Sequence, residues 1–303
     1  MSHNGQRYSD VKGHQDRGPR EFQSRHVDKD GEIMNFASSN VISTNPMNTI
    51  KNVAAMMSEN DVRRLPVIDA GTDRLQGLAA AIDIMDFMSG GEKYNILLKD
   101  YDGNFLKAIN SRIDKIMGPA SHVNKKASVE DALTLMLEAR KSCIPIVEDE
   151  ESLKVTAVTT ERDLLPHSKD FGVTVSEVMK SHPLTSSLGM MIGDVAKIMV
   201  RNRLRRLPVI QEDTVIGVVT VFDILDFIKE GHFTGIKVTD NLATRVDEVM
   251  EKKVVSVHPE NDLSQVSQQI LETGYGGFPV TVEGRLEGII TTTDVLRWVY
   301  RES

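Results

Sequence analysis

The feature that most constrains this chain is a unit of sequence that occurs four times with fixed internal spacing. Each copy begins with side chains at positions i, i+3, i+4 and i+7 that are apolar apart from one serine, the spacing of one buried helix face. From the first of these residues to a proline is sixteen positions in every copy: Ile50 to Pro66, Val129 to Pro145, Ile192 to Pro208 and Leu263 to Pro279. This regularity indicates one structural unit used four times.

Each proline is followed by a short apolar run, a polar turn and a second apolar run, which predicts a β-hairpin. We expect the proline at the first position of its strand, where its missing donor does least harm. An Asp then opens a further apolar segment, interpreted as a second helix. Three copies follow a similar lead-in and a strand, with lead-ins at residues 114–117, 176–179 and 247–250. The predicted order in each repeat is strand, helix, strand, strand, helix.

The repeats divide the chain into segments with short connections. Residues 1–34 are rich in Gly, Asp, Arg, Gln and His, a composition that predicts a disordered tail. We expect repeats at 35–89, 111–168, 172–231 and 243–302, with residues 90–110 as a connection. A repeat of about 55 residues cannot cover both faces of its own sheet, so repeats should pack in pairs. Copies one and three share Arg-Arg-Leu-Pro-Val-Ile, so the order A, B, A, B indicates a duplicated pair.

Composition limits the classes of partner and compartment. The net charge of −8 and the pI near 5.6 give no overall attraction to nucleic acid or to anionic membranes. The single cysteine, Cys143, can form no intramolecular disulfide and fits a reducing compartment. No run reaches the ~18 apolar residues that a membrane span needs. We therefore expect a soluble, cytoplasmic protein without a membrane span.

The repeated motif resembles the CBS domain, a module that occurs in pairs called Bateman modules. Its most specific match is Arg-Arg-Leu-Pro-Val-Ile together with Gly217-Val-Val-Thr220-x-x-Asp223, and the resemblance covers about residues 35 to 302. Four such domains in tandem resemble archaeal proteins similar to the γ subunit of AMP-activated protein kinase. The resemblance implies an α/β fold of four CBS domains in two paired modules, with a disc-like shape. It also implies adenine nucleotides in the clefts between paired repeats, as regulatory ligands.

The resemblance assigns roles to particular residues. The motif's Asp would hold the ribose hydroxyls, the Thr three residues earlier would face the phosphate, and basic residues just before the Pro would also approach the phosphate. The carboxylates are Asp83, Asp163, Asp223 and Asp294; the hydroxyls are Thr160, Thr220 and Thr291; the basic residues are Arg63, Arg64, Arg205 and Arg206. Copy one departs from the pattern, because Ala80 stands where Thr is expected. Copies two and four lack the Arg pair and would need to borrow a cation from a neighbour.

The same residues have interpretations that involve no ligand. Thr-x-x-Asp is also a capping box, which contributes roughly 1 kcal/mol to helix stability without any ligand. Arg201 and Arg203, near the Arg pair of copy three, are interpreted as a solvated helix end. An RNA-binding patch would need interleaved aromatic residues for stacking, which this cluster lacks. Copy three combines the Arg pair, Thr220 and Asp223, and there we favour ligand binding.

These observations predict a non-catalytic regulatory module that binds AMP, ADP or ATP and transmits occupancy to a protein partner that the sequence does not identify. The sequence has no Gly-rich phosphate loop before a helix, no metal-ligand spacing and no nucleophile beside a base, so we expect no enzymatic activity, no metal and no catalytic cofactor. Three alternatives stay open: a structural or dimerisation scaffold with empty clefts, a binder of S-adenosylmethionine, and a binder of nucleic acid. A homo-oligomer is also open.

Overall fold

The computed structural model describes residues 33–167, 170–231 and 242–301. The elements recur in each repeat. Repeat one contains α1 (Ile50–Glu59), β1 (Arg64–Ile68), β2 (Leu75–Ala80) and α2 (Ala81–Ser89). Repeat two contains β3 (Val123–Asn124), α5 (Val129–Leu137), β4 (Cys143–Val147) and β5 (Val155–Thr160). Repeat three contains β7 (Ser186–Ser187), α7 (Ile192–Asn202), β8 (Arg206–Gln211), β9 (Thr214–Thr220) and α8 (Val221–Glu230). Repeat four contains α11 (Leu263–Thr273), β10 (Gly277–Val282), β11 (Arg285–Thr291) and α12 (Thr292–Arg301).

Short elements stand between and before the repeats. The 3-10 turns are η1 (Ile33–Asn35) and η2 (Ile113–Lys115), and the connection after repeat one holds α3 (Tyr94–Tyr101) and α4 (Phe105–Ile109). The lead-in of repeat three contains α6 (Val175–Val178) and β6 (Lys180–Ser181), and that of repeat four contains α10 (Val246–Val249). The helices within the described part of the chain are too short or too polar to cross a membrane.

The first helix of every repeat begins at the residue that the apolar spacing predicts. Thr49, Ser128 and Asp262 precede three of these helices, and the side chain of each accepts a hydrogen bond from a backbone N–H of the first turn. Such a cap satisfies a donor that has no partner inside the helix. The i, i+3, i+4, i+7 face is buried in α1, α7 and α11, and in α5 it is buried except for the half-buried Val129.

The predicted hairpins form, but the proline is the third residue of its strand and not the first. Pro66 shows why this position is tolerated. Its carbonyl accepts from the backbone N–H of Thr44, so the proline faces a parallel partner that contributes only an isolated bridge. A missing donor costs little on a side where the ladder is this short.

Each lead-in crosses to the hairpin of the partner repeat. Gly118, from the lead-in of repeat two, bridges Leu78 on β2 of repeat one, and Ser38, near the start of repeat one, bridges Val158 on β5 of repeat two. The second pair repeats the exchange, because β6 pairs with β11 of repeat four and Glu251 bridges Val218 on β9 of repeat three. Repeats one and two are therefore one pair, and repeats three and four are the other.

Three glycines permit this exchange. Gly77, Gly217 and Gly288 lie on the second strand of their hairpins, under the Met that ends the exchanged lead-in. A Cβ at Gly217 would lie 2.6 Å from Sδ of Met250 and 3.0 Å from the carbonyl oxygen of Glu251. The close approach of the lead-in thus explains why glycine stands six residues before the Asp in these copies.

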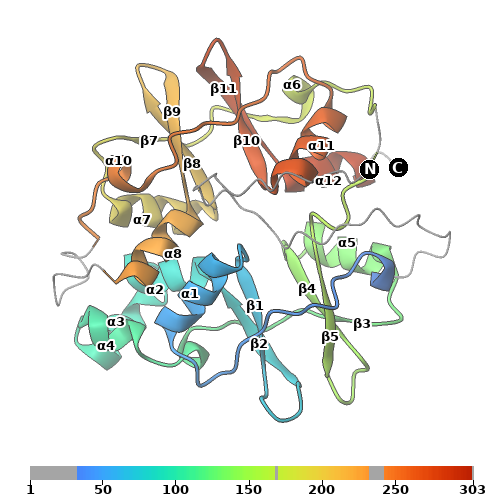
Figure 1. The fold of residues 1–303 in the computed structure, drawn as a ribbon, viewed down its shortest axis with the longest axis vertical. Coiled ribbons are helices and arrows are strands. Elements are labelled where there is room, and N and C mark those ends of the chain that lie inside the picture. Colours follow the sequence, from blue (N-terminus) through green and yellow to red (C-terminus); the bar gives the residue numbers. More distant parts are fainter. Residues whose placement is uncertain (1–32, 168–169, 232–241, 302–303) are drawn as a thin grey trace, which may run out of the picture.

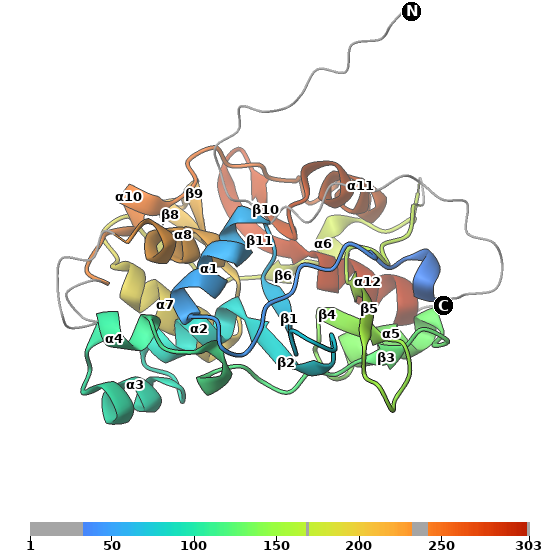
Figure 2. The ribbon, with the colours of Figure 1, turned by 60° about the horizontal axis from the view of Figure 1, so that its bottom comes forward.

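Helices join one pair to the other. Helix α1 packs against α8 and α2 against α7, so that repeats one and three share one hydrophobic core. Repeats two and four share a second core, which includes residues of α5, α11 and α12. Figure 1 shows the four repeats as quarters of a ring, and Figure 2 shows that the ring is flattened. Sheets pair within each module and helices pack between modules, which confirms the expected disc of two paired modules.

The second helix expected in repeat two does not form. The chain makes turns through residues 161–164, around Asp163, and residues 165–167 have no regular secondary structure. Pro166 follows Leu165 closely, and a proline there would remove a helical hydrogen bond and clash with the preceding turn. Repeat two therefore ends in a turn where α2, α8 and α12 continue as helices.

Two further differences concern the N-terminal segment and the connection. Residues 1–32 of the predicted tail lie outside the described residues, but Ile33 is fully buried in the core of repeats two and four, and its N–H donates to the carbonyl of Ala127. Ile33-Met34 corresponds to Ile116-Met117 in the lead-in of repeat two, a match that the sequence analysis missed. The connection after residue 89 is also helical, and Leu97 and Phe105 anchor α3 and α4 in the core.

Candidate functional site

Three of the predicted ribose-binding carboxylates accept the same pair of hydrogen bonds. Oδ2 of the Asp accepts hydrogen bonds from the backbone N–H and from the hydroxyl of the Thr three residues earlier. The N to Oδ2 and Oγ1 to Oδ2 distances are 2.7 and 2.9 Å for Thr160 and Asp163, 2.6 and 2.8 Å for Thr220 and Asp223, and 3.0 and 2.5 Å for Thr291 and Asp294. For Thr220 and Asp223, at the start of α8, both halves of the capping box are present.

The electrostatic surroundings of these carboxylates differ. Burial raises the pKa of Asp163 to about 6, against the lowering effect of its hydrogen bonds to Thr160 and of the charge on Arg162. Asp294 is 5% exposed, and its Oδ1 lies 3.1 Å from Nζ of Lys180. That lysine belongs to the exchanged strand β6 of repeat three. The fourth carboxylate is therefore balanced by a charge from the partner repeat.

The first carboxylate is held in a different way. Ala80 stands at the start of α2 and provides no side-chain cap. Oδ1 of Asp83 instead forms an ion pair with Nζ of Lys93, a residue of the turn that follows α2. The same ammonium donates to the carbonyl of Ile116.

The Arg residues of repeats one and three reach repeat two near the middle of the ring. Arg64 and Arg205 both donate from Nη1 to Oγ of Ser142, over 3.3 Å in the case of Arg205. Nη2 of Arg205 lies 3.5 Å from Oε2 of Glu161, which is itself buried. Since repeats two and three are diagonal quarters in Figure 1, Arg205 reaches across the centre of the ring.

Arg206 also contacts a residue of another repeat. Nη1 of Arg206 donates to the carbonyl of Gly277 in repeat four over 2.7 Å. Ser142 and Gly277 occupy positions of the Arg pair in their own repeats. The contacts are therefore the arrangement expected if repeats two and four borrow cations from one and three. Arg63 lies just before β1, and its carbonyl accepts from the N–H of Ala81.

The central guanidinium groups are electrostatically costly. Burial lowers the pKa of Arg64, and the neighbouring charge of Arg205 lowers it further, while Glu161 and Asp83 act in the opposite direction. Two like charges that share a serine hydroxyl favour a further anion beside them. The chemistry of this centre is thus suited to a phosphate group.

Sequence reasoning missed the roles of Glu161, Thr293 and Lys93. Oγ1 of Thr293 donates to Oε1 of Glu161 over 2.7 Å and joins repeat four to repeat two. Glu161 is a carboxylate at a position where the other repeats carry Ala81, Val221 and Thr292, and that difference was the available signal. Lys93 carries no comparable signal, because it lies outside the repeat.

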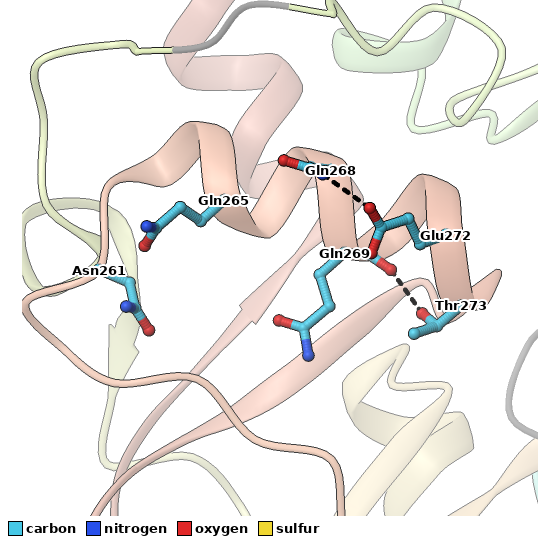
Figure 3. A pocket seen from close by; sticks show the side chains of 6 residues that line it. All are labelled: Asn261, Gln265, Gln268, Gln269, Glu272 and Thr273. Carbon is cyan, nitrogen blue, oxygen red and sulfur yellow. Dashed lines mark hydrogen bonds between the residues drawn. The ribbon is translucent and has the colours of Figure 1, made fainter.

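A surface hollow along α11 holds none of the predicted residues. It is lined by Asn261, Gln265, Gln268, Gln269, Glu272 and Thr273 (Figure 3). Gln268 donates to Oε1 of Glu272 over 2.7 Å, and Thr273 donates to the carbonyl of Gln269 over 2.6 Å. The residues that line the hollow include no basic side chain to hold a phosphate. Within the described residues, no group of His, Cys, Asp and Glu is arranged to hold a metal ion.

Comparison with known protein families agrees with this geometry. A family model of the CBS domain matches residues 31–90, 113–170, 175–230 and 246–301, one match for each repeat. The chain belongs to the CBS-domain family. The four CBS domains form two pairs, as the exchanged lead-ins show.

Several relatives align with this chain over most of their length. Protein MJ1225 of Methanocaldococcus jannaschii is 31% identical over 276 residues, which cover 88% of this chain and 98% of that protein. Its crystal structure, described as that of a candidate archaeal homologue of the γ subunit of AMP-activated protein kinase, has a TM-score of 0.79 at 30% identity and covers 88% of this chain and 99% of that one. The γ subunit of the Saccharomyces cerevisiae AMP-activated kinase is 24% identical over 82% of this chain and 83% of its own length.

Similarity to an enzyme is confined to part of that enzyme. Inosine-5'-monophosphate dehydrogenase of Staphylococcus saprophyticus is 28% identical over 174 residues, which cover 57% of this chain but only 35% of the dehydrogenase. The greater part of that protein has no counterpart in the match.

Proposed function

We propose that this chain is a non-catalytic regulatory module that binds an adenine nucleotide in clefts between paired CBS domains, with its phosphate at the central Arg residues. The observation that carries the proposal is the convergence of Arg64 and Arg205 on Ser142. It gathers basic groups from two repeats on a third repeat that has no Arg pair. The relationship to a kinase γ subunit supports a regulatory role over catalysis.

The parts of a nucleotide match the parts of the site. A carboxylate can accept two hydrogen bonds from vicinal ribose hydroxyls, and the carboxylate of Asp223 is proposed for this role. A guanidinium fork binds phosphate bidentately, which Arg205 and Arg206 can do next to the start of a helix, where the dipole also favours an anion. The adenine would lie against the exchanged lead-in, which forms the other wall of the cleft.

Occupancy would act on a protein partner through the relation between the two pairs. A phosphate held by Arg64 and Arg205 together connects the first pair with the second. A ligand can shift an equilibrium only through its different affinities for two states, and contacts that bridge the pairs supply such a difference.

Calorimetric titration with ATP, ADP and AMP tests the proposal. A ligand at a hundred times its dissociation constant stabilises the folded chain by ~2.7 kcal/mol, which a thermal shift detects. Arg205→Ala should weaken binding about tenfold or more, since a charged hydrogen bond contributes about 1.5–3 kcal/mol. Asp223→Asn should also weaken binding while it keeps an oxygen for the capping box.

Arg201→Ala is the matched control, because Arg201 is an exposed residue of α7, and its removal should leave the affinity unchanged. Absence of stabilisation by all three nucleotides and by S-adenosylmethionine would replace this proposal with the scaffold alternative. Binding of an RNA oligonucleotide in their place would favour the nucleic-acid alternative.

A further inference from the structure

Lys93 is an unusually well-anchored side chain beside the first carboxylate. Its ammonium donates to Oδ1 of Asp83 and, over 2.5 Å, to the carbonyl oxygen of Ile116. Its backbone N–H donates to Oδ1 of Asp86 over 2.9 Å. Both partners of the ion pair are largely withdrawn from water, with side chains that are 24% exposed. One residue is thus fixed by three hydrogen bonds.

The two acceptors of the ammonium belong to the two different repeats of the first pair. Asp83 is in the first turn of α2 in repeat one. Ile116 belongs to the lead-in of repeat two, whose next residues cross to β2. The ammonium therefore joins the wall that would contact a ribose to the wall formed by the exchanged lead-in.

A second lysine near a motif carboxylate provides a contrast. Lys180 pairs with Asp294 in the fourth cleft, but its side chain is 59% exposed and lies on the short strand β6. An exposed lysine can turn into water at little cost. Lys93 can leave only by breaking contacts with two acceptors in a partly dehydrated place.

We propose that Lys93 closes the first cleft, so that the chain binds no nucleotide at Asp83. The inference rests on the proposed function and limits it to the clefts of Asp163, Asp223 and Asp294. To accept ribose hydroxyls, Oδ1 of Asp83 would have to give up a charge-assisted bond for neutral ones and leave the ammonium without its partner. Ala80 agrees with this assignment, since the first repeat also lacks the hydroxyl that the others carry.

Stoichiometry in calorimetric titrations with AMP and ATP tests this assignment. Lys93→Met keeps the apolar stem and removes the charge, and it should bind one nucleotide more per chain than the wild type. Asp83→Ala in the wild-type background should leave stoichiometry unchanged, whereas in the Lys93→Met background it should remove the added site. Lys180→Met is the control and should add no site. A loss of one site in the single variant Asp83→Ala, or no gain in Lys93→Met, would overturn the proposal.

Lysine acetylation read by mass spectrometry separates this proposal from the function on which it rests. Failure of the proposed function appears in the wild-type titration, whereas the Lys93 contact is measured without any ligand. Lys93 should react more slowly than Lys180, and Asp83→Ala should accelerate its reaction. Saturating nucleotide should leave its rate unchanged. A nucleotide-induced rise in Lys93 acetylation would mean that the ligand displaces the lysine, and the first cleft would then be a working site.

Discussion

The half of the ring built by repeats one and three differs from the half built by repeats two and four, although all four share one motif. The first half packs two complete helix pairs, α1 against α8 and α2 against α7. The second half lacks one helix, because repeat two ends in a turn. The first half also supplies Arg64, Arg205 and Arg206, and the second supplies the small residues Ser142 and Gly277 that receive them. The difference explains the alternation A, B, A, B, since a shared basic centre needs long cationic side chains opposite short ones.

The largest test of this comparison concerns the two separate cores. Phe87 and Phe278 are fully buried, one in each core. Phe87→Ala and Phe278→Ala should each lower the free energy of unfolding by about 3–5 kcal/mol. Hydrogen exchange with mass spectrometry should show faster exchange in repeats one and three for the first variant and in repeats two and four for the second. Uniform acceleration in all four repeats would mean that the halves unfold as one unit.

A smaller effect distinguishes the carboxylate of repeat two by its dependence on pH. Its folded pKa is raised to about 6 from 3.8, so the folded state binds the extra proton between these values. The contribution of Asp163 to the free energy of unfolding is therefore most favourable below about pH 4. It falls by on the order of 2–3 kcal/mol as the pH rises through 6.

Asp163→Asn removes this titration and keeps an oxygen that can accept from Thr160. Chemical denaturation should show the variant gaining stability over the wild type between pH 4 and pH 7. A difference between Asp163→Asn and wild type that is the same at both pH values would contradict the assignment.

The periodicity of apolar residues predicted most helices and strands. It did not predict the features that depend on a single residue or on a contact between distant segments. The starts of the first helices follow from the apolar spacing, because Ile50, Ile192 and Leu263 are fully buried and the half-buried Val129 packs against the core of repeats two and four. Pro166 prevents the second helix of repeat two, and a motif drawn from what all four copies share does not include this proline. Ile33 was assigned to the tail because its partner, the core of repeats two and four, is assembled from distant segments.

The sequence predicted which residues form the candidate site, but not which residues of other repeats the Arg side chains contact. The Thr and Asp positions follow from the motif, since the capping box is a local structure. The destination of each Arg depends on how the quarters of the ring meet, and nothing near Arg205 in the sequence indicates that it reaches Ser142 and Glu161. Whether these residues bind a nucleotide stays a prediction.

The smallest expected effect comes from the threonine of the capping box. Oγ1 of Thr220 also accepts from the N–H of Phe222 over 3.2 Å and precedes a helix of ten residues. Thr220→Ala should therefore cost about 1 kcal/mol of unfolding free energy. Thr160 begins a turn without a helix, so Thr160→Ala should cost less, measured by denaturation in the Asp163→Asn background to exclude the buried charge. Equal losses would show that the hydroxyl stabilises the turn itself, and the two halves would then use this motif in the same way.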